Sequence, residues 1–508
     1  MNTQLITYPI LFQALLAVLL LFLWRKPGSQ RWTSIIGSGI GAIIAVILFV
    51  NVWNNGIQSI QLGNWEAPFG ISLVADTFAV TLVLLTNIVA FAVSIYSNSN
   101  MVSSRVKFGY YAMFHFLIMG LTGAFLTGDI FNLYVWFEVI IISSFVLLTI
   151  GGRKAQVEGA VKYFTLNMLA SIVFLTAIAM LYGVTGSLNM AELSQIIPTI
   201  ENKGLIETIS IIFFIGFGVK AGVFPLYFWL PASYHTPPAA VSALFGGLLT
   251  KVGVYAMIRV FTLIFPISGI NQTVFISIAG LTILFGGIGA LVQKNMIRIF
   301  SYLIICHIGF MIGGLSLFTE LAIIGTVFYM FHDIIVKTNL FLIGGITFRI
   351  FGNNDIKKMG GLMNNYPKLS MLFAISLFAL VGIPPLSGFW PKISLFGASY
   401  QTGQISLLIA FIFASFITLF IIAKIWNQVF SKYASEIDTL NKLKYFHQFN
   451  KKEKVAMVIP VIILSCITLY YGFFAEHIQI LSERISNELM HPEKYYEAVF
   501  NIKNKPTP

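Results

Sequence analysis

Charged residues are scarce in this chain. Asp, Glu, Lys and Arg make up 10% of its 508 residues, whereas hydrophobic residues make up 57%. Soluble domains carry about 25% charged residues. No linker or charge-rich stretch is long enough to mark off a soluble domain. The composition therefore excludes an ordinary water-soluble protein and predicts one domain embedded in a membrane.

Cysteine is almost absent as well. Cys306 and Cys466 lie far apart within apolar stretches and do not have the spacing of metal ligands. The sequence also lacks any haem, iron–sulfur or nucleotide motif. We therefore expect no metal site and no cofactor. If the chain belongs to a redox complex, the redox chemistry takes place in another subunit.

Long apolar stretches dominate the chain. A spanning helix needs about 20 predominantly apolar residues, and fourteen stretches qualify. They lie at approximately 6–24, 34–53, 73–97, 109–127, 129–150, 161–184, 207–230, 237–264, 272–292, 296–317, 321–349, 369–400, 404–431 and 454–475. No small-residue cleavage site follows the first, so we do not expect a signal peptide. The predicted fold class is an all-α polytopic membrane protein with about 14 transmembrane helices.

The basic residues gather on alternate loops. If the N-terminus lies outside, the odd-numbered loops hold nearly all of them, and Lys203 is the one basic residue on the outward loops. This asymmetry follows the positive-inside rule and places the odd-numbered loops in the cytoplasm. An even number of spans then places the C-terminus outside too. The net charge of +12 therefore reports topology, and we expect no nucleic-acid partner.

Five lysines and two acidic residues nevertheless lie within the apolar stretches. They are Glu138, Lys220, Lys251, Asp333, Lys337, Lys392 and Lys424. A charge at the bilayer centre costs at least ~2.5–3.5 kcal/mol, so such side chains face a protein interior or a wet cavity. A chain with this many is predicted to move ions or protons. The alternative is a structural scaffold in which the charges only hold helices and subunits together.

Proline interrupts two of the predicted spans. Pro225 follows Lys220 in the seventh span, and Pro384 and Pro385 precede Lys392 in the twelfth. Proline breaks or kinks a helix, and a break within a bilayer survives only where it is buried or lines a wet cavity. Paired interruptions in two halves of a transporter indicate inverted repeats. We expect two inverted five-helix repeats, spans 4–8 and 9–13, each with a broken helix.

The domain boundaries follow from these repeats. We expect spans 1–3 within 1–108, the first repeat within 109–264 and the second within 265–431. The last span and a polar tail then occupy 432–508.

The acidic residues predict ion pairs with the lysines. Glu138 lies near mid-membrane, where it is either an inert protonated carboxyl or, as we favour, the partner of a lysine on another helix. Asp333 and Lys337 are four residues apart and share a helical face, which predicts an ion pair of functional or structural kind. His332 points to a different face and is expected to have a supporting role. A lone histidine such as His307 is more often a core residue.

Two basic side chains lie nearer to span ends. Arg259 is expected to extend its guanidinium to the outer surface. Lys424 fits equally well as a snorkelling side chain or as part of the site.

The tail after residue 475 carries an apolar face. Ile478, Leu481, Ile485 and Leu489 are spaced for one side of a helix. Such an amphipathic helix lies on the membrane surface or against a partner subunit.

Several motifs resemble a known family. The stretch GVKAGVFPLYFWLPASYHTPPAAVSALFGGLLTKVG (218–253) is similar to the signature of the antiporter-like subunits. Respiratory complex I, membrane-bound hydrogenases and the Mrp cation/proton antiporters share these subunits. GNWEAPFGISLVAD (63–76), HDIIVKTNLFL (332–342) and SGFWPK (387–392) are most similar to the D-type subunits of the Mrp branch. The resemblance covers nearly the whole chain.

The resemblance implies roles for individual residues. Glu138 and Lys220 would form the input pair for protons, and Lys392 the output site. Lys251 and the region of His332 and Lys337 would form the central relay. Because burial disfavours the charged form of lysine and a nearby carboxylate favours it, lysines in changing surroundings can load and release protons.

The resemblance also implies a function and partners. We expect a subunit of an antiporter that exchanges cytoplasmic Na⁺, Li⁺ or K⁺ for external protons. Other membrane subunits, of A, B, C, E, F and G type, would be its partners in the inner membrane of a bacterial cell. The alternative is a proton-pumping subunit of a complex I-like or hydrogenase-like oxidoreductase. We expect a secondary transporter subunit and not an enzyme.

Overall fold

The computed structural model describes residues 3–265, 267–433 and 450–500. Within these ranges, eleven helical segments are long and apolar enough to cross a membrane. They are α2 (Pro27–Asn55), α3 (Thr77–Asn100), α6 (Ile130–Thr149), α7 (Lys154–Thr185), α9 (Lys203–Ala221), Ala239–Leu263, α13 (Gly269–Val292), α14 (Met296–Leu317), α15 (Glu320–Phe351), Ile405–Ser431 and α21 (Lys451–Phe473). Ala239–Leu263 comprises α11 (Ala239–Leu244), the π-helical turn η4 (Phe245–Leu249) and α12 (Thr250–Leu263). Ile405–Ser431 comprises α19 (Ile405–Ile425) and a second π-helical segment, η6 (Trp426–Ser431).

Three shorter apolar helices complete the bundle: α1 (Tyr8–Phe22), α5 (Tyr110–Leu126) and α17 (Pro367–Val381). The remaining short elements are η1 (Thr3–Ile6), η2 (Leu62–Asn64), α4 (Ser103–Lys107), α8 (Met190–Ile196), η3 (Ile197–Thr199), α10 (Trp229–Ser233), η5 (Ile356–Lys358), α16 (Leu362–Asn365), α18 (Phe389–Gln401), α22 (Ala475–Met490) and α23 (Glu493–Phe500). The prediction of an all-α membrane protein is confirmed. The count of about 14 crossings stays a prediction.

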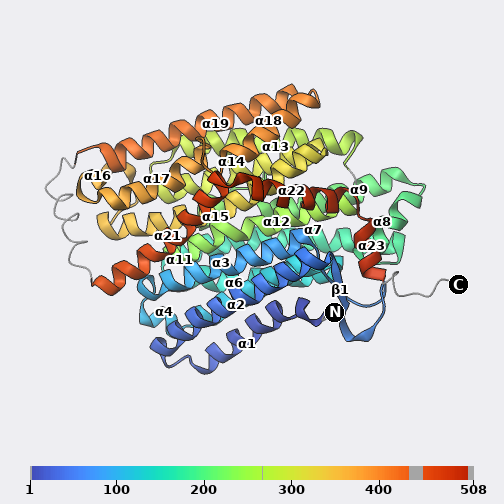
Figure 1. The fold of residues 1–508 in the computed structure, drawn as a ribbon, viewed down its shortest axis with the longest axis horizontal. Helices are drawn as coiled ribbons and strands as arrows, with labels where there is room; N and C mark the ends of the chain where they lie inside the picture. The colour runs from blue at the N-terminus through green and yellow to red at the C-terminus, as the bar shows by residue number, and fades with distance from the viewer. Residues whose placement is uncertain (1–2, 266, 434–449, 501–508) are drawn as a thin grey trace.

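A small hairpin lies at one end of the bundle, with α8 and α23 (Figure 1). Its strands, β1 (Gln58–Gln61) and β2 (Ser72–Ala75), pair antiparallel with Gln58 opposite Ala75. The Ser59 hydroxyl donates to the Ala498 carbonyl at 2.6 Å, which ties α23 to the hairpin. The basic residues of α4 lie at the opposite end (Figure 1).

The centre of the bundle consists of α11–α12, α14 and α15. The most apolar stretch of Ala239–Leu263 is entirely buried, and those of α14 and α15 nearly so. In α7, α13 and Ile405–Ser431, by contrast, fewer than half of the residues of the apolar stretch are buried. Helices that are apolar all round belong in the interior. The charged side chains of Lys251, Arg259, Asp333 and Lys337 on α12 and α15 are therefore shielded by the surrounding helices.

Both predicted helix breaks are present, and they are built alike. In the first, α9 ends at Ala221, Gly222 adopts a φ of +83°, and α10 begins at Trp229. In the second, α17 ends at Val381, Gly382 adopts a φ of +88°, and α18 begins at Phe389. Both glycines occupy a left-handed cap that residues with a side chain rarely adopt.

A second pair of features matches between the two halves. Asp129 forms an isolated backbone bridge with Asn189, and Asn295 forms one with Asp355. All four residues cap helix starts with their side chains. These matches support a repeated unit, and the boundaries 1–108, 109–264, 265–431 and 432–508 stay predictions.

The amphipathic tail packs on its own chain. Ile478, Ile485 and Leu489 of α22 are buried, and α22 lies along α15. Arg484 donates to the Trp53 carbonyl at 2.7 Å, and Ser486 to the Glu320 carbonyl at 3.2 Å. The expectation of a membrane surface or a partner subunit for the apolar face was therefore wrong, because the apolar face is already covered. Residues 434–449 and 501–508 of the predicted C-terminal region lie outside the described residues.

Candidate functional site

The site centres on Asp333, halfway along α15. Its carboxylate lies 2.6 Å from the Lys251 ammonium of α12 and 3.9 Å from the Lys337 ammonium, one turn further along α15. All three side chains are fully buried. The predicted pair of Asp333 and Lys337 is present, but the closer partner is Lys251. Breaking such a buried pair on one side leaves an uncompensated charge, at a cost of about 3–5 kcal/mol.

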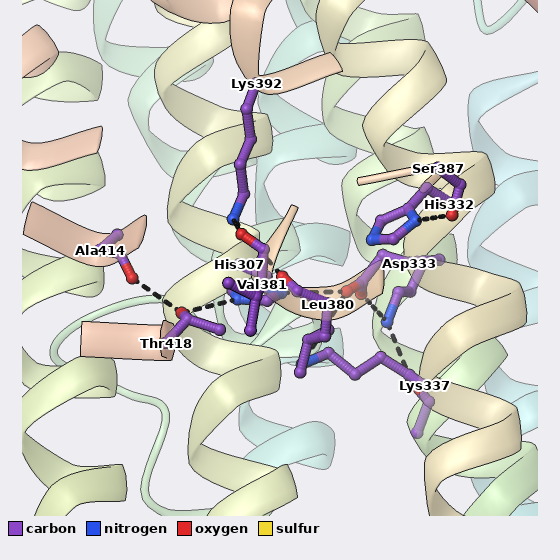
Figure 2. Close-up of polar contacts among 12 residues, drawn as sticks. His307, His332, Asp333, Lys337, Leu380, Val381, Ser387, Lys392, Ala414 and Thr418 are labelled. Atoms are coloured by element: carbon purple, nitrogen blue, oxygen red, sulfur yellow. Dashed lines mark hydrogen bonds and ion pairs between the residues drawn. The ribbon is translucent and has the colours of Figure 1, made fainter. Parts of the chain in front are cut away.

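His307 of α14 completes this cluster. Its Nδ1 lies 3.3 Å from an Asp333 oxygen, and its Nε2 lies 3.3 Å from the Thr418 hydroxyl on α19 (Figure 2). The sequence interpretation discounted His307, because a lone histidine is more often a satisfied core residue; the ring is fully buried with a partner at each nitrogen, and its part in the relay is a proposal. The ring connects the acid of α15 with the outer helix α19. The sequence signal for His307 is a histidine in the middle of an apolar stretch.

Close backbone packing brings α12 to α15. A Cβ on Gly247 would collide with the Thr338 side chain, and one on Gly246 with the Phe341 ring. Both glycines lie in η4, a π-helical turn of the kind often found at functional sites. The Gly246 carbonyl also accepts a hydrogen bond of 2.9 Å from Lys251. The wide turn therefore positions the lysine as well as allowing the contact.

The second helix break receives two side chains. The Lys392 ammonium turns back to the carbonyls of Val381, at 2.6 Å, and Leu380, at 3.4 Å, which end α17 (Figure 2). The His332 Nδ1 lies 2.8 Å from the Ser387 hydroxyl within the break. His332 thus faces away from Lys337, as the sequence predicts. The second break therefore contacts Lys392 through the carbonyls that end α17 and contacts α15 through Ser387 and His332.

The first helix break has a different arrangement. The Lys220 ammonium donates to the Ser171 hydroxyl at 3.0 Å and lies 4.8 Å from the centre of the Phe137 ring. No carboxylate of the described residues lies within 4.0 Å of it. The neighbouring Glu138 has a buried carboxylate oxygen, Oε1, without a hydrogen-bond partner. The structure therefore does not join Glu138 and Lys220 directly, and the input pair stays a prediction.

A small cavity lies between Lys220 and the centre. It has a volume of about 10 Å³ and is lined by Lys220, Asn167, Trp229 and the residues Leu249 and Val252, which flank Lys251. Its lining is mostly apolar, with Lys220 and Asn167 as polar members, and its volume is about that of one water molecule.

Arg259 also lies on α12, two turns beyond Lys251. It forms an ion pair with Asp76, the cap of α3, and both side chains are nearly fully buried. Its Nε donates to the Tyr255 hydroxyl at 3.4 Å. The expectation that Arg259 extends to the surface was wrong. A buried acid at the start of α3 was available as its partner, and sequence separation concealed it.

Lys424 lies apart from the cluster. Its ammonium donates to the Leu291 carbonyl of α13 at 3.0 Å, and the residue is half-buried. Among the described residues, no group of three His, Cys, Asp or Glu side chains is arranged to hold a metal ion. What the site offers is a line of ionisable and hydroxyl groups that can exchange protons.

Comparisons with known proteins agree on one family. Residues 127–418 match the family model described as NADH:quinone oxidoreductase/Mrp antiporter, TM. The D-type subunit of the Na⁺/H⁺ antiporter of Alkalihalophilus pseudofirmus is 41% identical over 98% of this chain and 99% of its own length. The corresponding Na⁺/H⁺ antiporter chain of Bacillus subtilis is 40% identical over 97% of this chain and 98% of its own length.

Solved structures show the same fold. A chain of the Mrp complex from Dietzia sp. matches with a TM-score of 0.88 and 25% identity, over 98% of this chain and 100% of its own. A chain of the membrane-bound sulfane sulfur reductase, an archaeal respiratory membrane complex, matches with a TM-score of 0.89 and 27% identity, with the same coverage.

Proposed function

Because the chain belongs to the NADH:quinone oxidoreductase/Mrp antiporter membrane family, we propose that it is the D-type subunit of a multisubunit antiporter. The antiporter exchanges monovalent cations, Na⁺ among them, for protons. The chain is a transporter subunit and not an enzyme, and its partners are the other membrane subunits of the complex. The structures of the Mrp complex and the sulfane sulfur reductase share one fold, so the fold alone does not choose between antiport and a respiratory role. The 41% identity to an antiporter subunit along the whole chain favours antiport.

The buried Asp333, held between Lys251 and Lys337, carries this proposal. One carboxylate cannot neutralise two buried ammonium groups, so the cluster favours the loss of a proton from one lysine. Movement of Asp333 toward one lysine strengthens the charged form of that lysine and weakens the other. A proton that arrives on one side is therefore released on the other.

The proposed proton path follows the polar contacts. Glu138 and Lys220 take up the proton, and the cavity beside Lys220 passes it by water to Lys251. Asp333 and Lys337 of α15 and His307 of α14 relay it toward the second break. His332 and Lys392 release it at the second break. The broken helices at Pro225, Pro384 and Pro385 supply the unpaired backbone and space that such a path needs.

Arg259 and Asp76 close the other route along α12. Arginine cannot be deprotonated in proteins, so Arg259 keeps its charge and repels protons that would pass from Lys251 toward α3. The ion pair with Asp76 and the contact with Tyr255 hold it in place. Released protons therefore leave by the second break.

The orientation rests on the distribution of basic residues. The helix α4, which carries Arg105 and Lys107, lies at one end of the bundle, and α8 and α23 lie at the other (Figure 1). Arg153 lines the same cavity as Arg105. The positive-inside rule then places the termini outside and the basic loops in the cytoplasm of a bacterial cell.

Antiport in everted membrane vesicles tests the function. The chain is co-expressed with the other subunits, and Na⁺, Li⁺ or K⁺ is added to vesicles that hold a pH gradient. We expect cation-dependent dissipation of the gradient, and its loss in Asp333→Asn at normal membrane abundance. Glu201→Gln, which removes an exposed loop carboxylate, is the control. Full antiport in Asp333→Asn would refute the proposed relay.

A further inference from the structure

A cavity opens at the end of the bundle that bears the basic loops. Its volume is about 460 Å³, within the ~300–1,000 Å³ of small-molecule sites. Three arginines line it, Arg105 of α4, Arg153 at the start of α7 and Arg349 near the end of α15. No acidic side chain is among the described residues that line it.

Two of these charges lack a counter-charge. Neither Arg105 nor Arg153 forms an ion pair with any residue that the structure describes. Burial and, next, the charge of Arg153 lower the pKa of the Arg105 guanidinium. Two arginines that repel each other across a cavity favour the binding of an anion, which relieves that repulsion.

Two further features of the cavity wall favour an anion: the amino end of α7 and the nearby charge of Arg298. The α7 helix runs for 32 residues from Lys154, and its amino end faces the cavity through Arg153 and Gln156. The amides of Arg153 and Gln156 already donate, to the Gln156 side-chain oxygen and the Arg153 carbonyl, so the helix end attracts an anion through its dipole. Burial and the charge of Arg298 lower the pKa of His235 to about 4. The neutral ring therefore accepts from the Arg298 guanidinium at 3.0 Å and holds it beside the cavity.

The rim is apolar. Val102 and Phe348 line the cavity and are 55% and 46% exposed. An apolar rim around a basic pocket, at the level where transmembrane helices end, is typical of sites for anionic lipid headgroups. The positive-inside rule accounts for the sign of the arginines. It does not account for their convergence on one cavity or for the lack of acidic residues there.

We propose that this cavity binds a phosphate-bearing anion through Arg105 and Arg153. The chemistry is that of a phosphodiester or phosphomonoester, which the planar guanidinium recognises with two parallel hydrogen bonds. The source is either the headgroup of an anionic phospholipid or soluble phosphate.

The test uses the full chain within its complex, reconstituted into phosphatidylcholine nanodiscs with or without phosphatidylglycerol. Native mass spectrometry counts retained phosphatidylglycerol, and a separate titration adds inorganic phosphate. The variant Arg105→Gln/Arg153→Gln is compared with Lys357→Gln/Lys358→Gln, which removes two exposed charges outside the cavity. Arg153→Lys keeps the charge without the two parallel bonds.

We expect the arginine double variant to bind at least about tenfold more weakly, since charge-assisted hydrogen bonds contribute more than ~1.4 kcal/mol together. The lysine control keeps wild-type binding, and Arg153→Lys lies between. Retained phosphatidylglycerol identifies the lipid as the source, and saturable phosphate binding without it identifies the soluble ion. Binding of neither probe, or equal losses in both double variants, would overturn the proposal. Assembly of each complex is checked by size-exclusion chromatography, and Arg153→Lys decides the question if the double variant does not assemble.

Discussion

The helix α12 carries two buried basic residues, two turns apart, and each pairs with an aspartate from another helix. Lys251 pairs with Asp333 at the centre of the bundle, and Arg259 pairs with Asp76 at the end that bears the hairpin. Burial and pairing are thus nearly the same at both positions. The difference lies in the base, because lysine gives up its proton readily when its surroundings change and arginine does not.

The surroundings reinforce this difference. Asp333 is shared by Lys251, Lys337 and His307, and the Lys337 ammonium has no hydrogen-bond partner among the described residues. Around the other pair, Asp76 accepts from the Ala79 amide at 2.8 Å. The Arg259 guanidinium lies over the rings of Phe78, Tyr255 and Tyr495. Asp333 and Lys251 therefore have other ionisable partners nearby, whereas Asp76 and Arg259 are held in one arrangement.

Replacing Lys251 by arginine and Arg259 by lysine tests this comparison most directly. Lys251→Arg keeps a positive charge beside Asp333 but fixes the proton, so we expect antiport to fall by ~10²-fold or more, the scale of a lost proton-transfer group. Arg259→Lys keeps a charge beside Asp76, so we expect a smaller loss of antiport than in Lys251→Arg, caused by the proton leak that a base able to release its proton opens along α12. Initial rates in everted vesicles, normalised to the abundance of the chain, measure both.

The exchange needs a control for space, because Lys251 is fully buried. Lys251→Met has a similar length and no charge, and we expect it to assemble and to lose antiport as Lys251→Arg does. Equal antiport in Lys251→Arg and the wild type would show that the central lysine serves only as a fixed charge, like Arg259.

Lys220 extends the comparison to a buried lysine that has no carboxylate within 4.0 Å among the described residues. We expect Glu138→Gln and Lys220→Ala each to lower antiport by ~10²-fold. Because both act in one uptake step, the double variant is expected to be no worse than either single variant. Lys203→Ala and Glu207→Gln, which change exposed residues of the same helix α9, are the controls. Strictly additive losses would separate Glu138 from Lys220.

Much of this arrangement could be predicted from the sequence. Apolar length predicts the helices. Proline placement predicts the breaks at Pro225 and at Pro384 and Pro385. The four-residue spacing of Asp333 and Lys337 predicts a contact within one helix. Each of these signals is local, so it survives without knowledge of the tertiary structure.

Contacts between distant segments could not be predicted in the same way. Lys251 and Asp333 are 2.6 Å apart in space but belong to different helices, and Asp76 lies far from Arg259 in sequence. The close approach at Gly247 depends on a π-helical turn that the sequence pattern does not reveal. The apolar face of α22 predicts burial but not the surface that covers it.

Lys392 is a further buried lysine, and it is either a proton carrier like Lys251 or a fixed charge like Arg259. Its ammonium donates to two backbone carbonyls of α17, an arrangement that suits either a proton carrier or an anchor. As a carrier, Lys392→Arg assembles and loses antiport by about tenfold or more, like Lys392→Ala, because arginine retains its proton. Lys424→Arg is the control, since Lys424 also donates to a carbonyl. Full antiport in Lys392→Arg would assign the residue to the anchors.

The smallest effect is expected at the end of the bundle that bears the hairpin, where Glu488 of α22 lies beside Asp76. The Glu488 carboxylate accepts from the Thr77 amide and hydroxyl, at 3.0 and 2.7 Å, and from Arg484. Burial and, next, the charge of Asp76 raise the pKa of Glu488 above its ordinary value of 4.5, although the bonds from Thr77 and Arg484 oppose this.

A raised pKa in the folded state means that the folded chain binds this proton more tightly than the unfolded chain. The associated stability is fully present below the unfolded pKa and is lost as the pH rises through the folded one. We therefore expect the melting temperature of the complex to fall slightly as the pH rises above the ordinary carboxyl pKa of 4.5, and Glu488→Gln to flatten this slope. Glu493→Gln, an exposed residue of α23, should keep the wild-type slope. An unchanged slope in Glu488→Gln would assign the pH dependence to another group. Unchanged antiport in the same variant would support the distinction between a central cluster that moves protons and an outer one that holds helices together.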